Sequence, residues 1–567
     1  MTRRETWLTA LLVFLVGLVV RTLAAAVIEF PKPEDTAYYV GVARNLVEGR
    51  GMVSDAIWTF HTPPLEFPKP AFEIWMPLPS LLAAASMWVH GLRAPIALEE
   101  AFRAAQVPFV VLGALVPVLA WRLAVDVTAE RGLPANRARM LALGTGLTAA
   151  VYLPLVLHSA LPDSTVVFGF FALAALVLMA RVLRDPRDTR FLDPRTIAIG
   201  LCVGLAALCR NEYVWLALVW VFLVWRLPLS WPARFRLVAM VAVASLLVYA
   251  PWMVRNWQEF GTPLPGQAIS NALSVTGFDI FAWNDEPTLA RYLAVGPGVL
   301  AEMRLVGTWH NLGNVLLYLG LPVSVIGILA LPGQVRDRAL RPLVLVSAIT
   351  FLVTSLLFPV ATTWGTFLHA AAPVHVLLLV SALGALDETI VRIGRWRGWT
   401  RPVAWLGPFL ATFASLMFTA ALMPSFGSGS IATAATYDAL RERMAAIGEP
   451  FDTTGGTVYI HDFPIWLAET EHVRTLGLPD ESPADVLDLA AAFPGTRFLI
   501  SSRPDHGAWP AILDGSDPAA ACFDELELGV PADPTLVKAL ADVRVFRLTC
   551  TAAPRALTSP VTVGPSP

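Results

Sequence analysis

Residues 7–28 read WLTALLVFLVGLVVRTLAAAVI, an apolar run long enough to cross a bilayer as a helix, and residues 33–39 read PEDTAYY. The rest of the chain has the same apolar character. Of its 567 residues, 56% are hydrophobic and 15% are charged, whereas soluble domains average about 45–50% apolar and about 25% charged residues. The sequence therefore predicts an integral membrane protein and excludes a cytosolic enzyme, a secreted module and a disordered chain.

The apolar runs predict eleven transmembrane helices. Arginine concentrates in alternate linkers, and these linkers share one side only if the short, proline-containing run at 74–91 lies in the membrane interface. This arrangement places the N-terminus in the cytoplasm and the C-terminus outside, as expected for a multi-pass protein of the cell membrane. The predicted spans are 7–28, 104–125, 140–160, 165–183, 196–209, 213–226, 237–253, 312–331, 343–360, 370–390 and 403–423.

The predicted topology leaves three large pieces outside. They are a first loop at 29–103, a second loop at 254–311 and a tail at 425–567, so residues 1–424 form the membrane domain. The tail alternates strand-like and helix-like runs, with strands expected at 457–460, 497–501 and 543–548 and a helix at 484–492. We expect a soluble α/β domain there. Cys522 and Cys550 both lie in it, in an oxidising compartment, and we predict that they form a disulfide.

Several common types of site are unsupported by the sequence. It contains no P-loop, no H-E-x-x-H, no C-x-x-C and no nucleophile elbow. The net charge of −3 provides no basic field for nucleic acid. The predicted cytoplasmic linkers are too short to contain a catalytic domain. Any active site is therefore expected on the outer face.

Glu34 and Asp35 open the first outer loop, just before a helical pattern at residues 38–48. An acidic pair at this position can cap the helix and interact with its dipole. A carboxylate at the water boundary can also accept a proton in catalysis. Both interpretations can hold together, because one carboxylate is enough to cap a helix.

Other charged residues recur near the predicted outer surface. Asp163 lies in a very short loop, where an acid close to the bilayer is costly unless it is paired or functional; it can therefore meet Asp35. His158 precedes it, although a histidine at the surface is often simply solvated. Cations at these positions can hold an anionic lipid headgroup or only anchor the protein at the interface. They are Lys69, Arg103, Arg210 and Arg255.

Together these features resemble the C-type (GT-C) glycosyltransferase superfamily, in particular the branch with protein O-mannosyltransferases and the aminoarabinose transferase that modifies lipid A. The similar motifs are the acidic pair on an interfacial helix with Gly49-Arg50-Gly51, Lys69-Pro70, Arg103, Asp163 and Pro251-Trp252. There are departures. The family pair often reads Asp then Glu, and Tyr38 stands where some members have a basic residue.

The resemblance implies transfer of a sugar from a polyprenyl-phosphate carrier to a lipid, glycan or protein acceptor at the outer face of the membrane, with inversion. It implies Asp35 and Asp163 as catalytic residues. Lys69, Arg103 and Arg255 would bind the donor phosphate. The sugar, the acceptor and any cofactor stay open, although a carboxylate at this position can hold a divalent metal such as Mg²⁺ or Mn²⁺. Residues in supporting positions are Glu34, Tyr39, Arg44, Glu66, His158 and Arg210.

Two other functions compete with this interpretation. One is a transporter or flippase of a lipid-linked or anionic substrate, whose expected signature is a pair of repeats with broken helices. The sequence shows no such internal symmetry, and its charges cluster near the predicted outer surface. The other is a non-catalytic scaffold of the same fold, against which the presence of both Asp35 and Asp163 argues.

Overall fold

The computed structural model describes residues 2–185, 193–334, 336–399, 403–503 and 509–550. The chain divides into two compact units. The helical unit contains residues 1–53, 70–277 and 288–431, and the sheet unit contains residues 54–69, 278–287 and 432–567. Two short pieces of the predicted outer loops thus belong to the sheet unit. The sequence analysis had assigned both pieces to the membrane domain.

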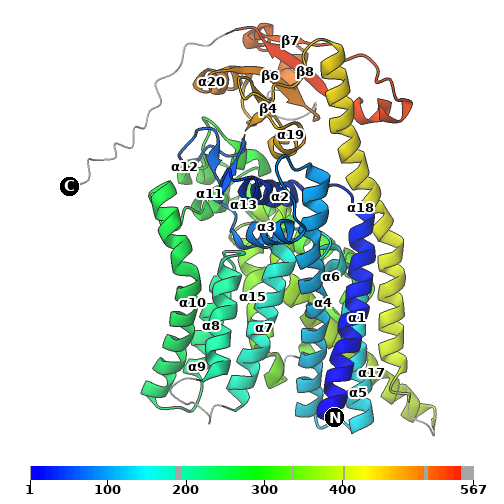
Figure 1. The fold of residues 1–567 in the computed structure, drawn as a ribbon. Coiled ribbons are helices and arrows are strands. Elements are labelled where there is room, and N and C mark those ends of the chain that lie inside the picture. The colour runs from blue at the N-terminus through cyan, green and yellow to red at the C-terminus, as the bar shows by residue number, and fades with distance from the viewer. Residues whose placement is uncertain (1, 186–192, 335, 400–402, 504–508, 551–567) are drawn as a thin grey trace. The chain divides into compact units, whose positions relative to one another are not determined.

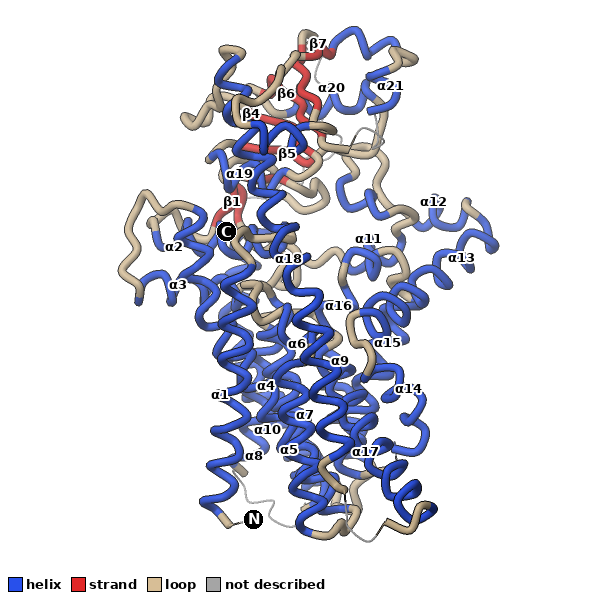
Figure 2. The backbone as a smooth tube through the Cα atoms, turned by 90° about the vertical axis from the view of Figure 1, so that its right-hand side faces the viewer, coloured by secondary structure: helices blue, strands red, loops and turns tan. Residues whose placement is uncertain are grey.

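Long apolar helices run side by side through the helical unit (Figures 1 and 2). Seven helices in the described residues are long and apolar enough to span a membrane, or eight if a pair bent by 112° counts as one span. That pair joins residues 296–318 to α14 (Val323–Gln334). The seven are α1 (Arg3–Val27), α4 (Leu98–Glu130), α7 (Ser164–Arg184), α10 (Trp231–Phe260), residues 338–356 with α15 (Arg341–Leu356), α17 (Ala372–Trp396) and α18 (Leu406–Ala446).

Seven or eight of the eleven predicted spans are therefore long enough, among the described residues, to cross a membrane as single helices. Three of the predicted spans correspond to α5 (Ala135–Val151), α8 (Pro194–Ala207) and α9 (Tyr213–Trp225), which have 17, 14 and 13 residues. A straight span needs about 20 residues. A tight turn at residues 208–212 separates α8 from α9, so an apolar stretch that is nearly continuous in sequence becomes two short helices.

Shorter elements of the helical unit complete the end of the bundle at which α7 begins. The predicted interfacial segments form α2 (Glu34–Val47) and α3 (Leu78–Val89), which pack against each other. The apolar core beneath them includes Phe102, Phe109 and Tyr152. The remaining elements of this unit are α6 (Leu153–Leu157), α11 (Ala268–Leu273), α12 (Leu289–Ala294), α13 (Gly296–Trp309), the π-helix η3 (His310–Tyr318), η5 (Ala361–Trp364) and α16 (Thr366–Ala370). The short η4 (Arg338–Leu340) instead contacts the last residue of α4, at the opposite end. Three elements lie at the boundaries between the two units in the sequence: β1 (Val53–Ser54), β3 (Lys69–Pro70) and η2 (Gly277–Phe281).

The sheet unit is a mixed six-stranded sheet in the order β2-β5-β4-β6-β8-β7. The first four strands of this order are parallel to one another, and β8 is antiparallel to both of its neighbours, β6 and β7. The strands are β2 (Ala56–Ile57), β4 (Val458–His461), β5 (Arg474–Gly477), β6 (Thr496–Ser501), β7 (Phe523–Glu525) and β8 (Arg544–Leu548). The helices are α19 (Pro464–Glu471), α20 (Pro483–Ala492), α21 (Trp509–Leu513), η6 (Pro518–Cys522) and η7 (Pro534–Leu540).

Two predictions for this unit are confirmed. All three expected strands and the expected helix are present, within one or two residues of the predicted bounds. Cys522 and Cys550 form a disulfide, with their Cα atoms 5.1 Å apart. The edge strand β2 was not predicted. It pairs with β5 through Ala56 and Ile57, far from the tail in sequence.

Candidate functional site

Asp35 lies in the first turn of α2, near the point where the chain leaves α1. The helix begins at Glu34, and Pro33, which has no side chain able to cap it, is the N-cap residue. Neither acid is therefore the N-cap, although both lie where the helix dipole favours negative charge. Asp35 is half-buried and accepts a hydrogen bond from the side chain of Trp75.

Asp163, unlike Asp35, is an N-cap residue: it caps α7. It precedes α7, and its Oδ1 accepts a hydrogen bond from the backbone N–H of Thr165 at 2.7 Å. Its side chain is fully buried. Among the described residues, Oδ2 has no hydrogen-bond partner. One oxygen of Asp163 is thus occupied by the helix, and the other is free to bind a further group.

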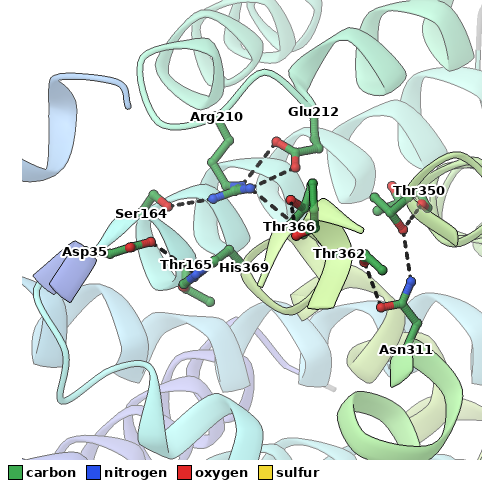
Figure 3. Close-up of polar contacts among 12 residues, drawn as sticks. Asp35, Ser164, Thr165, Arg210, Glu212, Asn311, Thr350, Thr362, Thr366 and His369 are labelled. Carbon is green, nitrogen blue, oxygen red and sulfur yellow. Dashed lines mark hydrogen bonds and ion pairs between the residues drawn. The ribbon is translucent and has the colours of Figure 1, made fainter. Parts of the chain in front are cut away.

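His369 lies between Asp35 and Thr165, the residue that donates to Asp163 (Figure 3). It lies in α16, and its Nδ1 is 2.6 Å from the hydroxyl of Thr165. Its Nε2 is 3.4 Å from Oδ2 of Asp35. A chain of polar contacts therefore runs from Asp163 through Thr165 and His369 to Asp35. These residues come from α2, α7 and α16, which are far apart in sequence.

Arg210 supplies the positive charge beside this chain. Its guanidinium forms a two-point ion pair with Glu212, at 2.9 and 3.1 Å. The same group donates to the hydroxyl of Ser164 at 3.0 Å and to the backbone oxygen of Thr366 at 3.4 Å (Figure 3). Arg210 thus ties the tight turn after α8 to the starts of α7 and α16, where Asp163 and His369 lie.

Burial sets the protonation of the site. Desolvation raises the pKa of Asp35 to about 6, although the nearby charge of Arg210 opposes this. Desolvation raises the pKa of Asp163 to about 7, against the hydrogen bonds from Thr165, and the charge of Asp35 raises it further. Desolvation, together with Arg210 and His158, holds the pKa of His369 well below its usual value. The ring of His369 is therefore neutral at pH 7.

Three of the supporting residues lie close to this cluster. Tyr39 is fully buried, and the charges of Asp35 and Asp163 both act on its hydroxyl. His158 is buried, with its ring 6.2 Å from that of His369. Glu34 is half-buried beside Asp35, whereas Arg44 is buried in the last turn of α2.

The cations predicted to hold a phosphate have individual partners. Arg103 donates to the backbone oxygens of Ala25 and Ile28 at 2.9 and 3.0 Å, so it binds carbonyls at the end of α1. Arg255 donates to the oxygen of Ala71 at 2.8 Å and lies over the rings of Trp252 and Phe260, 4.9 and 5.2 Å from their centroids.

The other two residues predicted from the first loop belong to the sheet unit. Lys69 is buried, and its ammonium donates to the backbone oxygen of Thr59 at 3.1 Å. Glu66 is exposed. Both residues therefore belong to a different unit from Asp35 and Asp163.

His369 and Thr165 were not predicted from the sequence. A signal was present in the linker at 360–369, which contains no arginine and so belongs to the predicted outer side, and which ends in Trp364-Gly365-Thr366-Phe367-Leu368-His369. No metal site forms in this arrangement: in the part of the chain that the structure describes, no three His, Cys, Asp or Glu side chains converge closely enough to hold an ion.

Comparisons with known proteins identify the fold of this chain. No protein-family model matches the sequence, and no curated protein matches it significantly. The archaeal oligosaccharyltransferase AglB from Archaeoglobus fulgidus, solved with an inhibitory peptide and a dolichol-phosphate, aligns with a TM-score of 0.55 and 14% identity over 88% of this chain and 70% of that one. ArnT from Cupriavidus metallidurans bound to undecaprenyl phosphate aligns with a TM-score of 0.52 and 14% identity over 96% of this chain and 99% of that one.

The apo state of the same ArnT aligns with a TM-score of 0.53 and 13% identity, over 98% of this chain and 100% of that chain. Identities this low show the fold alone. The structural alignments agree with the seven or eight spans and the mixed sheet described above. The protein is therefore a polytopic helical membrane protein with a GT-C-like fold and a C-terminal α/β region.

Proposed function

We propose that this protein is a membrane glycosyltransferase that moves a sugar from a polyprenyl-phosphate carrier to an acceptor hydroxyl at the outer face of the cytoplasmic membrane. The observation that carries the proposal is the polar chain Asp163–Thr165–His369–Asp35 at one end of a helical bundle with a GT-C-like fold. The carriers bound by AglB and ArnT in the solved structures, dolichol-phosphate and undecaprenyl phosphate, support the class of donor.

Asp35 is the general base in this proposal. It is half-buried, so an acceptor hydroxyl can reach it. A base works best when its pKa lies near the working pH, and burial brings the pKa of Asp35 to about 6. At pH 7 most of the carboxylate is ionised and still basic enough to take a proton.

His369 orients that base. In this proposal the single hydroxyl proton of Thr165 goes to Nδ1 of His369 and not to the carboxylate of Asp163, so the ring keeps its own proton on Nε2, which faces Asp35. The neutral ring can then hold one oxygen of Asp35 and leave the other for the acceptor. Asp163, with Oδ2 unpartnered among the described residues, can orient the acceptor hydroxyl from the opposite side.

The reaction follows from these positions. Asp35 takes the proton of the acceptor hydroxyl, and the oxygen forms a bond to the anomeric carbon of the sugar. The bond from that carbon to the phosphate oxygen breaks on the opposite face, and polyprenyl phosphate leaves with the electron pair. The anomeric centre is inverted. Cations stabilise the charge that develops on the phosphate, and we propose Arg255 for this role together with Arg103 and Arg210 of the same unit.

The direct test is an assay of donor turnover. Purified protein in lipid nanodiscs is mixed with a polyprenyl-phosphate-linked sugar, and release of polyprenyl phosphate is followed with and without a hydroxyl acceptor. The proposal expects release that depends on acceptor and on Asp35. Saturable binding of donor without release in any acceptor condition, in wild type and Asp35→Asn alike, would instead indicate a non-catalytic protein.

A further inference from the structure

Three arginines converge on one aspartate at the end of the bundle far from Asp163. Asp126 lies near the end of α4, and Arg122 one turn earlier reaches its Oδ1 at 3.0 Å. From α7, Arg181 and Arg184 reach its Oδ2 at 3.1 and 3.2 Å. These four residues are called the Asp126 cluster below. The cluster joins two helices of the helical unit through a single carboxylate.

The Asp126 cluster carries excess positive charge. Asp126 is almost fully buried, whereas the side chains of Arg122, Arg181 and Arg184 are 35%, 32% and 27% exposed. One acid meets three guanidinium groups, so two positive charges are left uncompensated inside the cluster. The Nε of Arg122 and the Nη2 of Arg181 have no acceptor among the described residues. The cluster therefore holds more donors than its own oxygens satisfy.

Neighbouring acids are engaged elsewhere. Glu130, one turn beyond Asp126, accepts the backbone N–H groups of Arg338 and Ala339 at 2.8 and 2.9 Å. Asp337 is paired with Arg131. Asp185, which follows α7, is exposed to solvent and offsets at most one further charge. Among the described residues, these acids thus leave the Asp126 cluster with a net positive charge.

The length of α7 places the cluster at headgroup depth. The helix has 21 residues, and at about 1.5 Å per residue it is as long as the hydrocarbon core is thick, about 30 Å. If its first residue lies at one boundary of the core, Arg181 and Arg184 lie at the other. Partly exposed guanidiniums at that depth face lipid phosphates, to which they can donate two parallel hydrogen bonds.

We propose that the Asp126 cluster is a binding site for the phosphate of an anionic phospholipid headgroup, in the leaflet opposite the Asp35 site. Asp126 holds the three guanidiniums in position, and their outer N–H groups bind the phosphate. This site is independent of the proposed transferase reaction.

The test compares nanodiscs of phosphatidylcholine with nanodiscs that also contain phosphatidylglycerol. Native mass spectrometry measures lipid retained by the protein, and inorganic phosphate is added as a soluble competitor. Arg181→Gln/Arg184→Gln should lower phosphatidylglycerol retention by about 5-fold for each charge removed. Arg139→Gln/Arg341→Gln, which removes two exposed arginines at the starts of α5 and α15, is the matched control and should retain lipid as wild type does.

Equal loss in both double variants would show only a general surface charge and would overturn the site. Displacement of lipid by millimolar inorganic phosphate would overturn the lipid assignment in favour of a soluble anion. Asp126→Asn gives a test that does not depend on losing arginines. If the cluster binds lipid, this variant should retain at least as much phosphatidylglycerol as the wild type. Phosphatidylglycerol should also raise the thermal stability of the variant more than that of the wild type. A purely structural ion pair predicts the same loss of thermal stability in both lipids.

Discussion

At the scale of single residues, the site depends on the different surroundings of two carboxylates. Asp35 is half-buried, whereas Asp163 is fully buried and fixed by the helix that it caps. Burial raises the pKa of both, to about 6 and about 7. A base and an orienting group need this division, because only the base must exchange protons with the acceptor.

Asp35→Asn should remove the base and leave the fold intact. Asn has nearly the same shape, and Pro33 rather than residue 35 is the N-cap of α2, so little helix stability is lost. We expect turnover to fall by roughly 10²–10⁴-fold with donor binding retained. Glu99→Gln, at an exposed acid in the first turn of α4, is the control and should stay near wild type. Full turnover in a folded Asp35→Asn protein would eliminate Asp35 as the base.

The pH dependence of turnover should show whether His369 acts on the carboxylate of Asp35. Turnover of the wild type should rise with pH through about 6, as Asp35 ionises. His369→Ala removes a donor that favours the ionised carboxylate, so the acidic limb should move to higher pH and turnover at pH 7 should fall by about 10-fold or more. If His369 has only a structural role, the substitution should lower the amount of folded enzyme and leave the acidic limb of the pH profile of turnover at the same pH. His90→Ala, an exposed site on α3, is the control.

The sequence could indicate Asp35 and Asp163 but not the link between them. Both acids stand out because each follows or precedes an apolar run directly, where a charge is costly. His369 and Thr165 carry no such signal, since hydroxyl and imidazole groups are common at helix ends. Their contact at 2.6 Å depends on how α16 packs beside α7, which a linear pattern does not encode.

At the scale of elements, the start of α7 couples helix stability to the site. Asp163 caps the helix through Thr165, and the next residue, Ser164, accepts a hydrogen bond from Arg210. The same turn therefore positions a carboxylate and a cation. A short loop before a long span is well suited to this role, because the spanning helix fixes its first turn rigidly.

Asp163 should also leave a signature in the pH dependence of stability. Its pKa is about 7 in the folded protein against 3.8 for an ordinary aspartate, so the folded state binds more protons between these values. The contribution of Asp163 to stability is therefore present at low pH and is lost as pH rises from about 4 to about 7. Thermal unfolding of Asp163→Asn, which still caps the helix, should show a weaker decline over this range.

Asp163→Ala separates the cap from the charge. It should lower the free energy of unfolding by about 1 kcal/mol relative to Asp163→Asn, because alanine cannot accept the hydrogen bond from Thr165. Parallel pH profiles for wild type and Asp163→Asn would contradict the raised pKa. Equal stability of the two variants would contradict the cap.

At the scale of the whole molecule, hydropathy predicted the fold class well and the details of the spans less well. The apolar runs correspond to helices, but α8 and α9 are too short to span alone, because Arg210 and Glu212 form a turn between them. The strands of the tail were visible as short β-branched and aromatic runs. Strand β2 was not, because two residues carry no periodicity and its partner β5 lies over 400 residues away.

The last prediction concerns which way the protein faces. The proposed reaction requires the starts of α2 and α7 to lie outside, and the one-sided arginine distribution supports this orientation. Alkaline phosphatase, which is active only outside the cytoplasm, should be active when fused after Pro567 and inactive when inserted after Asp185, at the opposite end of α7. A green fluorescent protein fusion should give the reverse pattern. An active phosphatase after Asp185 would invert the topology and place Asp35 in the cytoplasm, away from any outer acceptor, whereas the Asp126 cluster would keep its depth and only exchange leaflets.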